Sequence, residues 1–241
     1  MTYGMRFRNG GGTFQVDGQN VNFALRYKGT GTFSNLTYGA GSVRYATFTV
    51  TADTPFVAIY CPYATVCAKG AKSGGNWQFF IYSTEASAGA GFTYYVFDKA
   101  SQIGVSGGYG VRIRNPSSGE VVFDSRQKPM MIVLGASTET NPSAAMPSGR
   151  TLAIVTSKFS YQHNANYVDG STGTGQPPHS GAASGGLAVG GASTAYSTAK
   201  FSGGALVSAM DEFESYSLYD YAESSYGDST WNFFAVDVTN Y

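Results

Sequence analysis

The chain has 241 residues, of which 32 are glycine and only 12% are charged, and its formal net charge is zero. Average proteins contain about 7% glycine and about 25% charged residues, so this composition fits short strands and tight turns better than a helical bundle. No stretch of the sequence is dense enough in Lys and Arg to suggest a nucleic-acid-binding surface.

The charges are unevenly distributed along the chain. Residues 1–158 carry 14 Lys/Arg and 7 Asp/Glu, whereas residues 159–241 carry one Lys and 8 Asp/Glu. We interpret this asymmetry as complementarity between the two parts, either within one subunit or between neighbouring subunits of an assembly.

The first predicted element is a β-hairpin over residues 3–17. In "YGMRFRN" Met5 and Phe7 alternate with arginines, which is the period-2 pattern of a half-buried strand with the arginines outward. The turn "NGGG" and the returning strand "TFQVD", which ends at Asp17, complete the hairpin.

The same phrase returns at residues 109–115 as "YGVRIRN", followed by the turn "PSSG" and the strand "EVVFD". Val111 and Ile113 take the inward positions, and Asp124 ends the second copy as Asp17 ends the first. The repeat predicts two structurally related β-units, each opening with a hairpin, rather than two active sites.

Further short strands follow each hairpin, among them "SVRYATFTV", "NWQFFIYS" and "TWNFFAVDV". Their length and spacing predict an all-β, sandwich-like fold. We expect one domain over residues 1–105 and a second over residues 106–241. The only weak helix candidate is residues 206–222, where acidic and aromatic residues mix.

Residues 163–204 consist mostly of Gly, Ser, Ala and Thr. A segment of this composition cannot bury much apolar surface, so we expect a flexible loop or an extended arm that is ordered by a partner. Loops of this length are often functional.

Residues suited to catalysis are present, but not in a catalytic pattern. His163 and His179 both lie in the Gly/Ser-rich segment, and no GxSxG elbow accompanies them.

Six carboxylates lie close together near the end of the sequence: Asp211, Glu212, Glu214, Asp220, Glu223 and Asp228. A glycan-cleaving pair is one interpretation of this cluster. An acidic surface that meets a basic part of an assembly is the favoured one, so we predict that the protein is not an enzyme.

We expect neither a metal site nor a cofactor. Cys61 and Cys67 in "CPYATVC" are too few for a zinc site, and two free thiols are favoured over a disulfide across a hairpin. No Walker motif, dinucleotide fingerprint or EF-hand pattern occurs.

The first residues, "MTYGMRFRNGGG", do not resemble a secretory signal, and no stretch has the ~20 apolar residues that membrane insertion requires.

The repeated hairpin phrase resembles the opening of a group of small β-rich tail proteins from siphovirus-like tailed bacteriophages. The matching positions of the two copies are Tyr3, Gly4, Met5, Arg6, Phe7, Asn9 and Asp17, and then Tyr109, Gly110, Val111, Arg112, Ile113, Asn115, Gly119 and Asp124. The chain departs from the group in carrying this opening twice.

The resemblance implies a structural component of the virion tail, at the tail tip, baseplate or fibre attachment. Its partners would be other phage tail proteins and further copies of itself, with a trimer as the expected homo-oligomer. It would be assembled in the host cytoplasm and located in the tail of the virion, without binding nucleic acid.

An alternative function is that of a receptor- or carbohydrate-binding β-sandwich module, such as a tail fibre uses on the host cell surface. Aromatic rings would stack on sugar rings or contact a host protein. The candidate surface-contact residues are Tyr216, Tyr219, Tyr221 and Trp231, and Trp77 is a further aromatic candidate.

Overall fold

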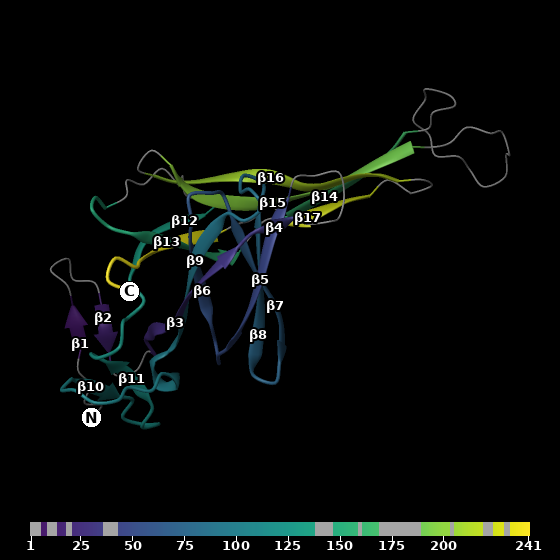
Figure 1. Cartoon of the computed structure of the whole chain (residues 1–241). Helices are drawn as coiled ribbons and strands as arrows, with labels where there is room; N and C mark the ends of the chain where they lie inside the picture. Colours follow the sequence, from purple (N-terminus) through teal and green to yellow (C-terminus); the bar gives the residue numbers. More distant parts are fainter. Residues whose placement is uncertain are drawn as a thin grey trace.

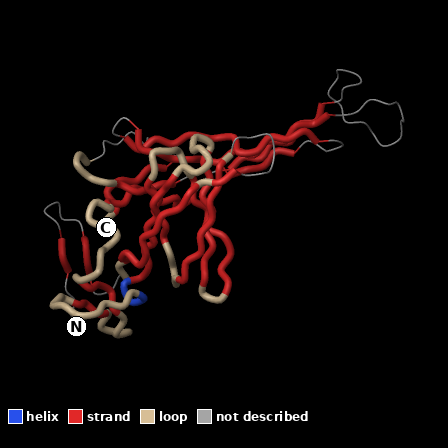
Figure 2. Tube along the Cα trace, viewed as in Figure 1, coloured by secondary structure: helices blue, strands red, loops and turns tan. Residues whose placement is uncertain are grey.

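The computed structural model describes residues 6–8, 14–17, 21–35, 43–137, 147–158, 161–168, 189–202, 205–218, 224–228 and 232–241. Within these ranges the chain forms strands β1 to β18 and one short 3-10 helix, η1 (Ala100–Gln102), with no α-helix. The strands pair antiparallel in one six-stranded sheet, two four-stranded sheets and two hairpins (Figures 1 and 2). The predicted all-β class is therefore confirmed.

The largest sheet has six strands. Their order is β12 (Ile132–Ser137), β18 (Asn232–Asp237), β13 (Leu152–Lys158), β6 (Phe56–Tyr60), β9 (Gly91–Lys99) and β3 (Phe23–Thr32). Strands from both sides of the expected domain boundary after residue 105 therefore share one sheet.

The two ends of this sheet meet through residues 128–130, which run directly into β12. The amide of Leu25 on β3 donates a hydrogen bond to the carbonyl of Lys128 at 2.7 Å, and the amide of Met130 donates to the carbonyl of Phe23 at 2.8 Å. Because β12 pairs with β18 at the opposite end of the sheet, these bonds close the six strands into a barrel.

Aromatic and aliphatic side chains fill the inside of the barrel. The buried members are Ala58, Tyr95, Phe97, Ala153, Val155, Val236 and Val238, with Phe23, Leu25, Phe56, Met130, Phe234 and Tyr241 packed against them. Tyr241 packs against this cluster, with its ring centroid 6.0 Å from that of Phe97. Its backbone oxygen accepts a hydrogen bond from Lys28 Nζ at 2.7 Å.

A four-stranded sheet covers the outer face of β6 and β9. Its order is β4 (Ser34–Asn35), β5 (Arg44–Thr51), β8 (Asn76–Ser83) and β7 (Val66–Ser73). The chain passes from the barrel into this sheet at Phe33, which is 1% exposed. The core between the two layers includes Phe79, Ile81 and Val96, so this part of the molecule is sandwich-like.

Two glycines of β3 lie opposite aromatic residues of β9, because Gly29 pairs with Tyr94 and Gly31 with Phe92. A Cβ added at Gly29 would come within 2.4 Å of the Tyr94 ring, and one added at Gly31 within 2.4 Å of the Phe92 ring. The Tyr94 ring is itself stacked on Phe48 at 4.1 Å, which limits how far it can move. Glycine is therefore required where these rings cover the strand.

We expect Gly29→Ala to lower the free energy of unfolding by about 1–3 kcal/mol, the usual cost of overpacking a core. Urea unfolding followed by fluorescence measures this change. Gly104→Ala is the matched control, because a Cβ there meets no heavy atom within 4 Å. Equal stability of the two variants would contradict the close packing of Tyr94 on Gly29.

Both predicted hairpins are present. The first pairs β1 (Arg6–Arg8) with β2 (Phe14–Asp17), and the second pairs β10 (Arg112–Arg114) with β11 (Val121–Asp124). In the backbone register Arg6 pairs with Asp17 and Arg112 pairs with Asp124, and each hairpin has a register shift before its last arginine. The sequence repeat therefore corresponds to a repeated register.

The predicted inward positions of the second hairpin are only half correct. Ile113 is 7% exposed and packs on Val122, but Val111 is 51% exposed. The reason is that β10 begins at Arg112, so Val111 precedes the strand pair. Met5 lies outside the described residues.

The remaining four-stranded sheet contains two strands of 14 residues each. Its order is β16 (Ala205–Leu218), β15 (Val189–Ser202), β14 (Tyr161–Val168) and β17 (Ser224–Asp228). One end of the sheet lies over the barrel, and the other end projects away from the body (Figure 1). We call residues 161–168, 189–196, 211–218 and 224–228 the arm.

The base of the long hairpin formed by β15 and β16 is fixed to the body. Ala199 and Leu206 are both 0% exposed, in a cluster with Ile154 and Phe233 of the barrel. Backbone hydrogen bonds of 3.0 Å in both directions join Ala199 to Thr65. The arm therefore extends from an anchored base.

Two sequence predictions are corrected here. The Gly/Ser-rich segment was expected to be a flexible loop or an arm ordered by a partner. Its residues 163–168 and 189–202 instead form strands, because neighbouring strands of the same chain pair with them. The helix candidate over residues 206–222 is wrong, since Ala205–Leu218 forms β16. The rest of both segments lies outside the described residues.

Candidate functional site

The predicted surface-contact residues are only partly described. Tyr216 lies in β16, opposite Ala192 of β15. Tyr219, Tyr221 and Trp231 lie outside the described residues. Trp77 is partly buried against the sandwich core, and Lys72 Nζ lies 5.2 Å from the centroid of its ring, so it does not offer a free stacking platform.

The acidic candidates lie at opposite edges of the arm. Asp211 belongs to β16 and Asp228 to β17, and register pairs connect them through Tyr196 and Tyr161. Three strand spacings of about 4.8 Å place these two positions roughly 14 Å apart. Glycosidase carboxylates lie about 5–9.5 Å apart, so Asp211 and Asp228 are not placed as such a pair. Asp220 and Glu223 lie outside the described residues.

Only one of the two candidate histidines is described. His163 lies in β14, between Thr194 of β15 and Tyr226 of β17, and His179 lies outside the described residues.

The register of the arm assigns its residues to two contrasting faces, because successive residues of a strand alternate between faces and paired residues share one. One face takes the positions of Tyr161, His163, Tyr167, Tyr196, Tyr216 and Tyr226, together with Asp211, Glu214 and Asp228. The other face takes Gln162, Asn164, Asn166, Ser193, Glu212, Ser215 and Ser225. We call the first the tyrosine face.

A register shift in β16 separates two neighbouring acids. Glu212 pairs with Ala195 and Glu214 with Thr194, which leaves Phe213 as an extra residue. Residues two apart normally share a face, but this bulge assigns Glu214 to the tyrosine face and Glu212 to the opposite one. The tyrosine face cannot be predicted from the sequence alone, because its residues share a face only through the pairing of four strands.

A buried carboxylate organises the second hairpin. The Asp124 side chain is 0% exposed and accepts hydrogen bonds from Arg126 Nη2 at 2.6 Å and Arg112 Nε at 2.7 Å. The hydrogen bonds from Arg126 hold the pKa of Asp124 well below its usual value; burial opposes them, and Arg112 adds to them. Gly110 is required beside this cluster, since a Cβ there would lie 2.7 Å from Arg126 Cγ. We assign the cluster a structural role.

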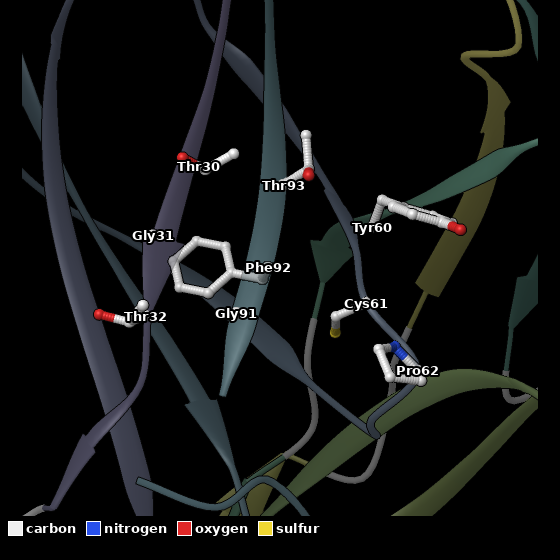
Figure 3. A pocket seen from close by; sticks show the side chains of 9 residues that line it. All are labelled: Thr30, Gly31, Thr32, Tyr60, Cys61, Pro62, Gly91, Phe92 and Thr93. Carbon is white, nitrogen blue, oxygen red and sulfur yellow. The ribbon is translucent and has the colours of Figure 1, made fainter. Parts of the chain in front are cut away.

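A shallow hollow of about 540 Å³ is lined by residues of β3 and β9 and by the end of β6 (Figure 3). Thr93 of β9 pairs with Thr30 of β3 on one side and with Tyr60 of β6 on the other. In the next row Thr32 pairs with Gly91, which has no side chain to fill the space. Cys61 and Pro62 continue the lining beyond Tyr60, and none of the lining residues is charged.

The two thiols are free, as expected. Burial raises the pKa of Cys67 to about 12 and also raises the pKa of Cys61. Both are therefore protonated near neutral pH, which is unfavourable for a nucleophile.

Among the described residues, no group of three or more His, Cys, Asp or Glu is arranged to hold a metal ion. The described part of the chain also contains no helix that is long and apolar enough to cross a bilayer.

Comparisons of the chain with protein-family models, with curated proteins and with solved structures gave no match.

Proposed function

We propose that the protein is a structural component of a bacteriophage tail, at the tail tip, baseplate or fibre attachment, and that it assembles as a homo-oligomer through its arm. The observation that supports this most is the arm itself, which projects beyond the body and carries a face with five tyrosine and three acidic positions (Figure 1). The resemblance of the two hairpins to tail proteins supplies the setting, and the repeated register is consistent with two related β-units.

The composition of the arm suits contact with another copy of the chain. Tyrosine is enriched in protein interfaces, and arginine packs well against its ring. The arm contains no Lys or Arg, whereas residues 1–158 have a net charge of +7. The tyrosine face would therefore meet a basic surface of a neighbouring copy.

The edges of the arm offer a second mode of contact. Within the described residues, β16 and β17 each pair with another strand on one side only. An unpaired strand edge can accept a strand from a partner. A ring of copies, with a trimer as the expected form, would cover such edges.

The first test is the oligomeric state of the purified full chain, measured by size-exclusion chromatography with light scattering. We expect a homo-oligomer that weakens as salt is raised, because salt screens the attraction between acidic and basic surfaces. Glu214→Lys should shift the mass toward the monomer by placing a positive charge on the tyrosine face. Glu212→Lys, the same change on the opposite face, is the matched control. A monomeric wild type, or equal effects of the two variants, would contradict assembly through this face.

The second test locates the protein in a particle. Antibody labelling of intact phage particles that contain the chain, viewed by electron microscopy, should mark the distal end of the tail. Label on the capsid would contradict a tail component.

The proposal also includes contact with other tail proteins and with a glycan or protein of the host surface.

A further inference from the structure

We infer that the hollow formed by β3, β9 and β6 binds a neutral saccharide. This inference does not depend on assembly through the arm, because the hollow and the arm lie on different strands. It also uses none of the four residues that the sequence suggested for surface contact.

The first step is the aromatic ring at the rim of the hollow. Tyr60 is 45% exposed at the end of β6, whereas the other aromatic residue of the lining, Phe92, is 5% exposed and faces the sandwich core. An exposed tyrosine ring presents an apolar face beside a hydroxyl group. A pyranose ring has matching chemistry, with C–H groups on its faces and hydroxyl groups around its edge.

The second step is the row of hydroxyl groups beside the ring. Thr30 and Thr93 form one row with Tyr60, and Thr32 lies in the next row (Figure 3). A threonine hydroxyl both donates and accepts hydrogen bonds, as a sugar hydroxyl does. Because these residues lie on paired strands, their spacing is set by the sheet rather than by a loop.

The third step is the space and its charge. Gly91 lines the hollow opposite Thr32 and has no side chain to occupy the space there. The volume of about 540 Å³ falls within the roughly 300–1,000 Å³ of small-molecule sites. The uncharged lining offers no ion pair to a sulfate, phosphate or carboxylate, so it favours neutral sugars over anionic ones.

The experiment uses the full chain and two panels of oligosaccharides, followed by saturation-transfer NMR and calorimetry. The neutral panel contains oligomers of glucose, galactose, mannose and N-acetylglucosamine, and the anionic panel contains sulfated and uronic-acid oligomers. We expect binding from the neutral panel. No binding from it, or binding from the anionic panel alone, would overturn the inference.

Variants then place the site. Tyr60→Ala should weaken binding at least tenfold and Tyr60→Phe much less, because the ring provides the stacking surface. Thr93→Val keeps the shape and removes one hydroxyl, so it should weaken binding several-fold. Gly91→Ala puts a methyl group into the hollow at an ordinary 3.9 Å from the carbonyl oxygen of Gly31, and it should also weaken binding while the fold is kept.

The matched control is Tyr109→Ala, because Tyr109 is a fully exposed tyrosine that does not line the hollow. It should bind as the wild type does. Binding that survives Tyr60→Ala unchanged, or falls equally in Tyr109→Ala, would overturn the assignment to this hollow. The oligomeric state of Tyr60→Ala is measured alongside and should equal that of the wild type, which separates loss of this site from failure of assembly.

Discussion

Replacing Phe97 with alanine should lower the free energy of unfolding by about 3–5 kcal/mol, the usual cost of removing a buried phenylalanine ring. Phe97 is 0% exposed and belongs to the cluster inside the barrel, where the Tyr241 ring lies 6.0 Å away. The cavity would open between six strands that hydrogen bonds hold in place, so the barrel could not easily collapse to fill it. Urea unfolding followed by circular dichroism measures the change.

Two variants keep this prediction testable. Tyr27→Ala removes an aromatic side chain that is 40% exposed on the neighbouring strand, and it should cost much less. If Phe97→Ala does not fold, Phe97→Leu should still fold with a loss of about 1–1.5 kcal/mol. A loss below about 1 kcal/mol for Phe97→Ala would mean that Phe97 is not enclosed in a packed barrel.

The second large effect is expected at Asp124, whose substitution by asparagine should destabilise the protein and change its response to acid. The folded state lowers the pKa of this carboxyl below its ordinary value of 3.8. Its stabilising contribution is therefore fully present above about pH 4 and is lost as the pH falls from there toward the folded pKa. In Asp124→Asn this acid-dependent part of the stability profile should disappear.

At neutral pH the same variant leaves Arg112 and Arg126 facing an uncharged amide. The loss should exceed the roughly 0.5 kcal/mol typical of surface substitutions. Asp53→Asn is the matched control, because its ion pair with Lys99 is solvent-exposed and should contribute little. Thermal unfolding of the three proteins between pH 3 and pH 7 makes the comparison. Parallel profiles for wild type and Asp124→Asn would refute the role of Asp124 as a charged anchor.

The sequence predicts local elements of this fold better than their assembly. Both hairpins follow from the alternation in "YGMRFRN" and "YGVRIRN", because strand period and turn chemistry are local properties. Closure of the barrel does not follow, since it depends on backbone bonds between residues 23–25 and 128–130. Nothing in the side chains of those residues encodes the pairing.

The secondary structure of the arm could not be predicted from its amino-acid composition. The sequence of strand β15, "VGGASTAYSTAKFS", shows no alternation of hydrophobic residues and contains few β-branched residues. Its composition therefore predicts a loop. It is a strand because β14 and β16 satisfy its backbone on both sides. In β16 the extra residue Phe213 interrupts the period-2 pattern, so simple alternation does not reveal this strand in the sequence.

The hollow could not be found from the sequence. Thr30, Tyr60 and Thr93 are common residues without a shared motif, and they come together only because β3, β9 and β6 are neighbours. The sequence shows that Tyr216, Tyr219, Tyr221, Trp231 and Trp77 are aromatic, but it does not show which aromatic rings are exposed.

The place of β18 in the barrel bears on how the chain reaches its native state. This strand, the last that the structure describes, lies between β12 and β13, which precede it by about 80 to 100 residues. The six-stranded ring is therefore incomplete until residues 232–237 have left the ribosome, so the earlier strands cannot fold as a finished unit during synthesis. Such non-local pairing slows folding and leaves strand edges open while it lasts. We therefore expect the pairing of β18 with β12 and β13 to be a slow step in the folding of the barrel.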